Sequence, residues 1–296
     1  MGAFWCYNTN MRKIENDNYI VEVEEIGAEL ARFCNKKTGI EYIWNADPKY
    51  WGGHGPILFP FIGGMTGLEY SYDGKVYPMT KHGIIRKASF TYEEKEDELI
   101  CTYVNDNPNW PFKCRLIVDY KLVGNKLYIN NKVLNDDDKV MYYGFGGHPG
   151  INVPLNKNLK FEDYYVEFPE AEKPRQKKFS PDFLQGGPTV DYPMENNRIP
   201  LHHDLFDNDA IVIQDGGHRV RIATDKDEHY AEVTFRGFQY CGLWHAMAVP
   251  APYVCVEPWS CMPGPTGRML ELEKKDDFFA LMPQSENNHL LTIEIN

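Results

Sequence analysis

Apolar side chains recur with a period of two over most of the chain. The clearest examples are seven short runs of alternating or continuous apolar residues, a pattern typical of strands that bury one face. These runs span residues 20–24, 98–104, 127–133, 218–223, 231–235, 253–256 and 290–295. No segment shows the 3.6-residue period of a long amphipathic helix. The pattern therefore predicts a protein built almost entirely from β-strands.

Short polar segments separate several of these runs. Residues 35–39, 72–75 and 123–126 combine glycine with asparagine, aspartate or lysine, and such segments suit the tight turns of antiparallel hairpins. We therefore expect strands that follow each other in the sequence to pair.

The region from residue 152 to residue 209 departs from this pattern. Its periodicity is weak and prolines recur at positions 154, 169, 174, 181, 188, 193 and 200, which favours a looped excursion over a linker between independent domains. We expect one domain spanning residues 1–296. Because so many strands must avoid open edges, the expected fold is all-β, as a large antiparallel two-sheet β-sandwich.

Composition narrows the classes of function. The net charge is −12 and the longest basic run is the short segment 175–178, so nucleic-acid binding is disfavoured. Seven cysteines show no Cys-x-x-Cys spacing, which argues against a zinc knuckle or a redox pair. Segment 1–20 carries charges instead of a signal-peptide core, and no apolar run is long enough to cross a membrane. We expect a cytoplasmic protein that binds a small, weakly charged molecule.

Two motifs far apart in the sequence carry the strongest candidate chemistry. Segment 144–150, GFGGHPG, holds His148 among glycines that permit unusual dihedral angles and close approach to a ligand. Segment 254–259, VCVEPW, places Glu257 before Pro258, which we expect to end regular strand pairing. Such an imidazole and carboxylate can form a proton-transfer pair. Both also have structural interpretations, as a hydrogen-bonded turn histidine and a strand-end ion-pair partner.

A third segment, residues 81–86 with the sequence KHGIIR, places His82 and Arg86 just after a predicted hairpin. Both side chains can donate hydrogen bonds to hydroxyl groups, although surface loops often carry such residues without a binding role. His54, in a second glycine-rich segment, is a weaker candidate. The segment around His148 lacks the third glycine of a dinucleotide-binding fingerprint, and no helix is expected to follow it.

These segments, in this order, resemble motifs of the aldose 1-epimerase (galactose mutarotase) superfamily, and most closely its LacX-like branch. The resemblance runs nearly from end to end. The matching pieces are Pro56-Ile57-Leu58-Phe59-Pro60 with Ile62-Gly63, Tyr70-x-Tyr72-x-Gly74-Lys75-x-Tyr77, His82-Gly83-x-x-Arg86, Gly146-Gly147-His148-Pro149-x-x-Asn152, Leu205-Phe206-Asp207-Asn208-Asp209-Ala210 and Glu257-Pro258-Trp259. Each motif alone is weak, whereas the ordered set is strong.

The resemblance implies a galactose mutarotase-like supersandwich and the interconversion of the α and β anomers of a free hexose. It implies that His148 is the general acid on the ring oxygen and Glu257 the general base on the C1 hydroxyl, so that the ring opens, rotates about C1–C2 and closes. A glutamate of pKa ~4.3 is ionised near neutrality, and a histidine of pKa ~6.5 beside it can be held protonated. We expect these starting states, with neither a metal nor an organic cofactor required.

By the same resemblance, His82 and Arg86 bind sugar hydroxyls or stabilise the charge that develops on the ring oxygen, and Asp209 accepts a hydrogen bond from a sugar hydroxyl. We prefer Asp209 to Asp207 because it directly precedes the strand-like run 210–213.

Trp244 is a candidate stacking platform for the apolar face of a pyranose, with core packing as the alternative role. The expected partner is a monosaccharide, bound by a monomer or homodimer that engages neither nucleic acid nor membrane.

Two positions depart from the family pattern and affect sugar recognition. Gly64 stands where relatives often have arginine, so one hydroxyl contact is expected to be missing or taken over by Arg86. Ile151 stands where relatives tend to have an aromatic residue.

Three alternative functions remain. A hexose-6-phosphate mutarotase would need a basic cluster at the pocket rim, which the acidic balance and Gly64 disfavour. A non-catalytic sugar-binding protein would not need both His148 and Glu257. A glycosidase usually needs two carboxylates flanking the bond, and the sequence offers one well-placed acid.

Overall fold

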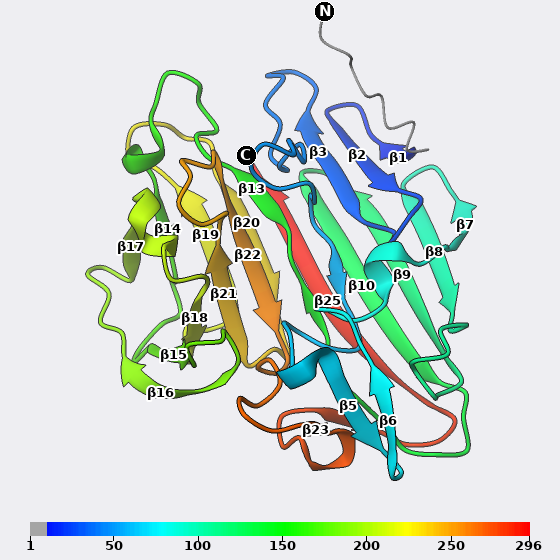
Figure 1. Ribbon diagram of the computed structural model, residues 1–296. Helices are drawn as coiled ribbons and strands as arrows, with labels where there is room; N and C mark the ends of the chain where they lie inside the picture. The colour runs from blue at the N-terminus through cyan, green and yellow to red at the C-terminus, as the bar shows by residue number, and fades with distance from the viewer. Residues whose placement is uncertain (1–10) are drawn as a thin grey trace, which may run out of the picture.

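The computed structural model describes residues 11–296, which form two large antiparallel sheets and several small ones (Figure 1). The larger sheet has nine strands, and its long central strands pair through unbroken registers. Its order is β17 (Arg198–Pro200), β14 (Tyr165–Glu167), β19 (Arg219–Ala223), β20 (Ala231–Phe235), β25 (Ser285–Ile295), β10 (Lys126–Asn135), β9 (Cys114–Val123), β8 (Glu98–Val104) and β7 (Thr91–Glu94).

The second large sheet has eight strands and carries the GFGGHPG and VCVEPW motifs of the sequence. Its order is β16 (Gln185–Asp191), β15 (Arg175–Phe179), β18 (Ile211–Gln214), β21 (Tyr240–Trp244), β22 (Tyr253–Trp259), β12 (Gly146–Gly147) and β4 (Ile57–Leu58), with β13 (Gly150–Asn152) also paired to β22. All of these pairings are antiparallel.

Three small sheets and five single turns of 3₁₀-helix complete residues 11–296. The small sheets are β1 (Met11–Glu15), β2 (Tyr19–Glu24) and β3 (Leu30–Asn35); β23 (Leu270–Glu271), β5 (Glu69–Tyr72) and β6 (Lys75–Pro78); and β11 (Met141–Tyr143) with β24 (Phe279–Leu281). The 3₁₀ turns are η1 (Thr66–Leu68), η2 (Ile85–Lys87), η3 (Phe161–Asp163), η4 (His203–Phe206) and η5 (Leu272–Lys274).

The seven apolar runs of the sequence all form strands, namely β2, β8, β10, β19, β20, β22 and β25. In β10 every second side chain is buried, because alternate residues of a strand face opposite sides of the sheet. The predicted hairpins at 72–75 and 123–126 join β5 to β6 and β9 to β10. The all-β sandwich predicted from the sequence is confirmed.

Two local expectations were wrong in detail. The proline-rich region contains four short strands, β14 to β17, which extend the outer edges of both large sheets. Edge strands tolerate proline because one side of each needs no ladder partner. The other error concerns Pro258, since β22 continues through it to Trp259.

Pro258 is tolerated within β22 because of the hydrogen bonds on the side of the strand that faces the glycine-rich segment. Val256 N donates to Pro149 O at 3.1 Å and Ser260 N donates to Phe145 O at 2.9 Å. Residue 258 lies between them on the same side of the strand, and there the partner chain leaves the sheet between β12 and β13. A proline therefore costs no ladder hydrogen bond at this point.

The main hydrophobic core lies between the two large sheets and draws on both. It includes Leu116 and Ile293 from the nine-stranded sheet and Val254 and Val256 from β22. Because side chains alternate along β22, Cys255 and Glu257 point to the other face of the eight-stranded sheet. On that face, Glu257 lines a pocket.

All six cysteines among the described residues are free and buried. None of the helical turns within residues 11–296 is long or apolar enough to span a lipid bilayer. The sequence prediction about the N-terminal segment falls partly on residues 1–10, which lie outside the described residues.

Candidate active site

The six site residues predicted from the sequence line a single cavity of about 240 Å³. They are His82, Arg86, His148, Asp209, Trp244 and Glu257. Eight further residues complete the lining: Trp51, Gly63, Lys81, Phe179, Phe183, Ala210, Trp259 and Pro263. Residues from eight separate segments of the chain therefore converge on one small pocket over the eight-stranded sheet.

His148 and Glu257 are in direct contact at this pocket. His148 Nε2 lies 3.1 Å from Glu257 Oε1, and the two side chains are only 9% and 2% exposed. Trp259 Nε1 donates to the other glutamate oxygen, Oε2, at 3.2 Å. One carboxylate oxygen is thus held by the indole, while the other is left for the imidazole or for a ligand.

The break between β12 and β13 positions the imidazole. Gly146 pairs with Trp259 and Gly150 pairs with Cys255, so His148 sits at the point where the chain leaves β22. A side chain at Gly146 would come within 2.9 Å of Pro258 O, which explains the need for glycine there. The two sequence motifs are therefore adjacent segments of one sheet.

Burial sets the protonation states of His148 and Glu257. These states differ from the expected starting states. Removal from water lowers the pKa of His148 to about 3 and raises the pKa of Glu257 to about 8. Between these values the pair holds one proton, and both shifts favour the carboxyl group over the imidazole as its site. Both shifts oppose the sequence-based expectation of an ionised glutamate and a protonated histidine, because burial is not visible in the sequence.

His82 is presented to the pocket as a neutral donor. Its Nδ1 accepts a hydrogen bond from Gly63 N at 3.1 Å, which leaves the ring proton on Nε2. Burial holds the pKa of His82 well below its usual range, and the nearby His148 adds to this effect. The backbone at His82 is left-handed, with φ of 67°. Gly83 follows with φ of 81°, and a Cβ added to it would lie only 2.1 Å from Phe59 O.

Trp51 is the main site residue that the sequence analysis missed. Its ring stacks on His148 with centroids 4.9 Å apart and an angle of 29°. The loop that carries it is held by the buried Glu29, whose Oε1 accepts a hydrogen bond from Gly55 N at 2.9 Å and another from His54 N. The glycine-rich segment around His54 was the available signal, but the histidine was weighed instead of the tryptophan.

Trp244 and Asp209 occupy the places expected of ligand contacts. Trp244 lies edge-on to His148 at 5.6 Å and to Trp51 at 5.6 Å, and it also lines the pocket. Asp209 lines the pocket just before β18, and the negative charge of this residue helps to raise the pKa of Glu257. Asp207 is not part of the lining.

One wall of the pocket is basic. Lys81 and Arg86 are both exposed at the lining, and their charges act to lower the pKa of Glu257 and of His148. Any ligand at this wall meets two cationic side chains despite the acidic character of the whole chain.

The two family departures have different structural consequences. A Cβ at Gly64 would lie 3.6 Å from Leu184 Cδ2, at the tip of the β15–β16 hairpin that also brings Phe183 to the pocket. An apolar hairpin tip thus lies beside the position where relatives often have arginine. Ile151 is fully buried in the main core and does not line the pocket.

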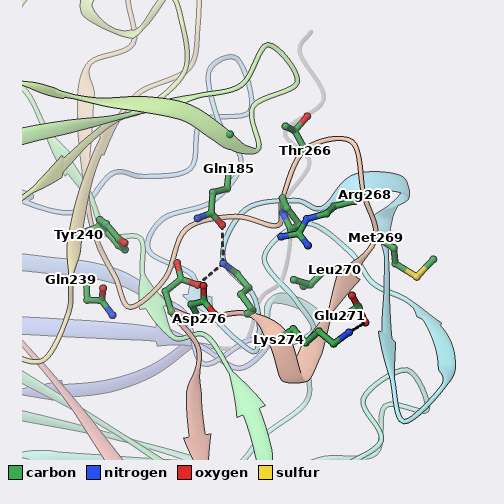
Figure 2. A pocket seen from close by; sticks show the side chains of 14 residues that line it. Gln185, Gln239, Tyr240, Thr266, Arg268, Met269, Leu270, Glu271, Lys274 and Asp276 are labelled. Atoms are coloured by element: carbon green, nitrogen blue, oxygen red, sulfur yellow. Dashed lines mark hydrogen bonds and ion pairs between the residues drawn. The ribbon is translucent and has the colours of Figure 1, made fainter.

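A larger hollow of about 610 Å³ borders the start of β16 (Figure 2). It is lined by Gln185, Thr266 and Tyr240 among others, and it holds none of the six predicted residues. Its cations are largely paired within it, as Lys274 Nζ lies 2.6 Å from Glu271 and Lys275 Nζ lies 2.5 Å from Asp277. The chemistry is therefore concentrated in the smaller pocket.

Comparison with known sequences places this arrangement in a family. The sequence profile described as aldose 1-epimerase matches residues 11–271. The chain belongs to the aldose 1-epimerase family. Both the plasmid and the chromosomal LacX proteins of Lactococcus lactis subsp. lactis are 30% identical to it over 261 residues, covering 84% of this chain and 87% of the relative. The LacX-like resemblance drawn from the motifs is confirmed.

Solved structures agree with this family assignment. A galactose mutarotase-like protein from Lactobacillus casei superposes with a TM-score of 0.91 at 29% identity, covering 97% of this chain and all of the other. A galactose mutarotase related enzyme from Lactobacillus acidophilus gives a TM-score of 0.92 at 29% identity, covering 97% of each chain. This aldose 1-epimerase family member therefore has the galactose mutarotase-like fold expected from its sequence.

Proposed function

We propose that this protein is a mutarotase that interconverts the α and β anomers of a free hexose by general acid-base catalysis. The observation that carries the proposal is the His148–Glu257 contact of 3.1 Å inside a pocket of about 240 Å³. That volume is below the ~300–1,000 Å³ of pockets for drug-sized ligands, so it suits a single sugar ring.

The proton inventory of the pair matches the reaction. Ring opening removes the proton of the C1 hydroxyl and adds one to the ring oxygen, breaking the C1–O5 bond and forming the C1 carbonyl. Ring closure on the other face reverses both transfers, so the cycle consumes no proton. As the sugar enters, the shared proton passes from Glu257 to His148 across their 3.1 Å contact. Glu257 then takes the C1 hydroxyl proton while His148 delivers its proton to the ring oxygen.

The surrounding side chains suit a polyhydroxylated ring. His82 offers an Nε2–H donor, Arg86 offers guanidinium donors, and Asp209 offers a carboxylate acceptor. Trp51 and Trp244 present aromatic surface that can cover the apolar face of a pyranose. Their rings also exclude water from the proton-transfer pair.

Polarimetry on freshly dissolved α-D-glucose and α-D-galactose tests the proposal. Wild type is expected to shorten the time to optical equilibrium relative to buffer, whereas Glu257→Gln and His148→Asn should each lose about 10²–10⁴ in rate, the usual contribution of one proton-transfer group. Circular dichroism of each variant checks that the fold is retained. A fully active double variant would contradict the assignment of the pair.

The exposed Lys81 and Arg86 support a second candidate, a hexose 6-phosphate as the substrate. Two cations at one wall can hold a phosphate by charge-assisted hydrogen bonds. Comparing kcat/KM for glucose and glucose 6-phosphate in wild type and Arg86→Ala separates the two substrates. A preference for the phosphate that disappears in the variant would favour the second candidate.

We further propose a cytoplasmic setting for the protein as a monomer or homodimer. The six free, buried cysteines among the described residues support a reducing compartment, where thiols persist without pairing. Light scattering of the purified protein would give the oligomeric state.

A further inference from the structure

A buried thiol lies directly behind the proton-transfer pair. Cys255 precedes Glu257 by two residues on β22, so both side chains point to the same face of the strand. The imidazole of His148, the sulfur of Cys255 and a carboxylate oxygen of Glu257 all lie within 4.8 Å of one another, and all three residues are buried. The acid-base chemistry described above makes no use of this sulfur.

Imidazole, thiolate and carboxylate are the three ligand types that Zn²⁺ takes in proteins. Tetrahedral zinc with bonds of about 2.0–2.3 Å needs ligand atoms about 3.3–3.8 Å apart, so ligand atoms that lie within 4.8 Å of one another must close by up to about 1.5 Å. Hard cations such as Mg²⁺ or Ca²⁺ prefer several oxygens, and this cluster provides a single carboxylate. The chemistry selects a soft or borderline divalent metal.

Two further features leave the ligands free for a metal. The buried His148 Nδ1 has no hydrogen-bond partner within the described residues, so no side chain fixes the tautomer of this ring. Trp259 donates only to Glu257 Oε2, so the one contact that a metal must replace at Oε1 is the one with His148 Nε2 at 3.1 Å. His148 and Glu257 line the pocket, which gives a metal a route from solvent to the cluster.

We propose that His148, Cys255 and Glu257 form an inhibitory site for Zn²⁺ or a similar divalent transition metal. The fourth position is open toward the pocket and holds a water molecule or a sugar hydroxyl. Binding releases the thiol proton and the proton shared by the pair to solvent, because zinc binds the deprotonated ligands. Both proton-transfer groups are then occupied, so metal binding blocks mutarotation; this consequence rests on the proposed function.

Co²⁺ is the probe for the site itself, because it takes the same ligands as Zn²⁺ and its bond to thiolate absorbs in the near ultraviolet. Wild type is expected to gain this band with one equivalent of Co²⁺ and to lose it on addition of Zn²⁺. Cys255→Ser should lack the band and bind Zn²⁺ at least tenfold more weakly by calorimetry. Cys255→Ala, which buries no hydroxyl, gives the same loss if the serine variant does not fold.

Cys241→Ser is the matched control, because Cys241 is also fully buried, on the neighbouring strand β21, but lies outside the cluster. It should keep both the band and the affinity. A wild-type spectrum without a thiolate band, or an unchanged spectrum in Cys255→Ser, would overturn the site.

Activity then tests the inhibition. Zn²⁺ should slow wild-type mutarotation and a chelator should restore it, whereas Cys255→Ser should keep its basal rate and need at least tenfold more Zn²⁺ for the same inhibition. Equal inhibition of wild type and Cys255→Ser would overturn the role of the thiol. If wild type shows no mutarotation, the proposed function fails, while the Co²⁺ spectrum still decides the metal site.

Discussion

At the residue scale, the proposed activity depends on one proton held between two buried side chains. The imidazole of His148 and the carboxyl group of Glu257 have pKa values displaced in opposite directions by the same cause, loss of water. Between about pH 3 and pH 8 the pair therefore keeps a single proton.

The pH dependence of turnover follows from this shared proton. We expect kcat/KM to be nearly constant from about pH 5 to 7 and to fall above the Glu257 pKa of about 8, where the pair loses its proton and no acid remains. Polarimetric rates corrected for buffer catalysis measure the profile. A rate that climbs steadily up to pH 10 would contradict the shared-proton account.

The same burial makes the contribution of Glu257 to the free energy of unfolding depend on pH. Its pKa is raised to about 8 in the folded state, so its contribution to stability is present below the unfolded value of ~4.3 and is lost as the pH rises to 8. Glu257→Gln should therefore become more stable relative to wild type across this window, by up to ~1.4 kcal/mol per pH unit. Urea unfolding at pH 5, 6.5 and 8 measures the difference. A constant difference would show that Glu257 is not buried as described.

Sequence analysis predicted which residues line the site better than it predicted their protonation states. His148, Glu257 and His82 lie in short motifs with distinctive neighbours, and the ordered set of motifs pointed to one family. Trp51 was missed because its position depends on a loop held by the distant Glu29. The ionisation of the pair was wrong because pKa depends on burial, which arises only when the chain has folded.

At the scale of elements, the site is built where strands are interrupted. His148 projects from the break between β12 and β13, and Pro258 lies opposite that break. Alternating patterns predicted the strands well because one face of each is buried. They could not predict the break, because it results from the pairing of two segments far apart in the sequence.

Gly83 is an element-scale test of how the His82 loop is held. A Cβ there would meet Phe59 O at 2.1 Å, and the residue has φ of 81°. Gly74 has a similar φ of 71° at the tip of the β5–β6 hairpin, with nothing within 4 Å. Gly74→Ala should cost only the ~1–2 kcal/mol of left-handed backbone, whereas Gly83→Ala should cost about 3 kcal/mol or more because overpacking adds to it. Denaturant unfolding compares the two. Equal losses would contradict the close approach.

At the scale of the whole molecule, the two large sheets share one core. The main cluster includes side chains from Ile14 to Ile295 and from both large sheets. The proline-rich region contributes edge strands to each sheet instead of separating two units. The overall architecture could be predicted from strand content and the family resemblance, whereas the edge strands were too short and irregular for a periodic signal.

We propose from this shared core that the chain unfolds as one domain. Calorimetry should show a single transition whose van't Hoff enthalpy equals the calorimetric enthalpy, since neither sheet retains its buried face without the other. Two resolved transitions, or a sheet that stays protected from hydrogen exchange after the other has opened, would contradict a single domain.

The central claim is that His148 and Glu257 exchange the anomers of a bound sugar. The most direct measurement is the rate at which the α and β anomer signals of a hexose interconvert at equilibrium, by NMR exchange spectroscopy with glucose, galactose and glucose 6-phosphate. We expect wild type to accelerate exchange of at least one of these sugars above the buffer rate, and Glu257→Gln to return it close to that rate. Exchange at the buffer rate for every sugar, or undiminished exchange in the variant, would contradict the account.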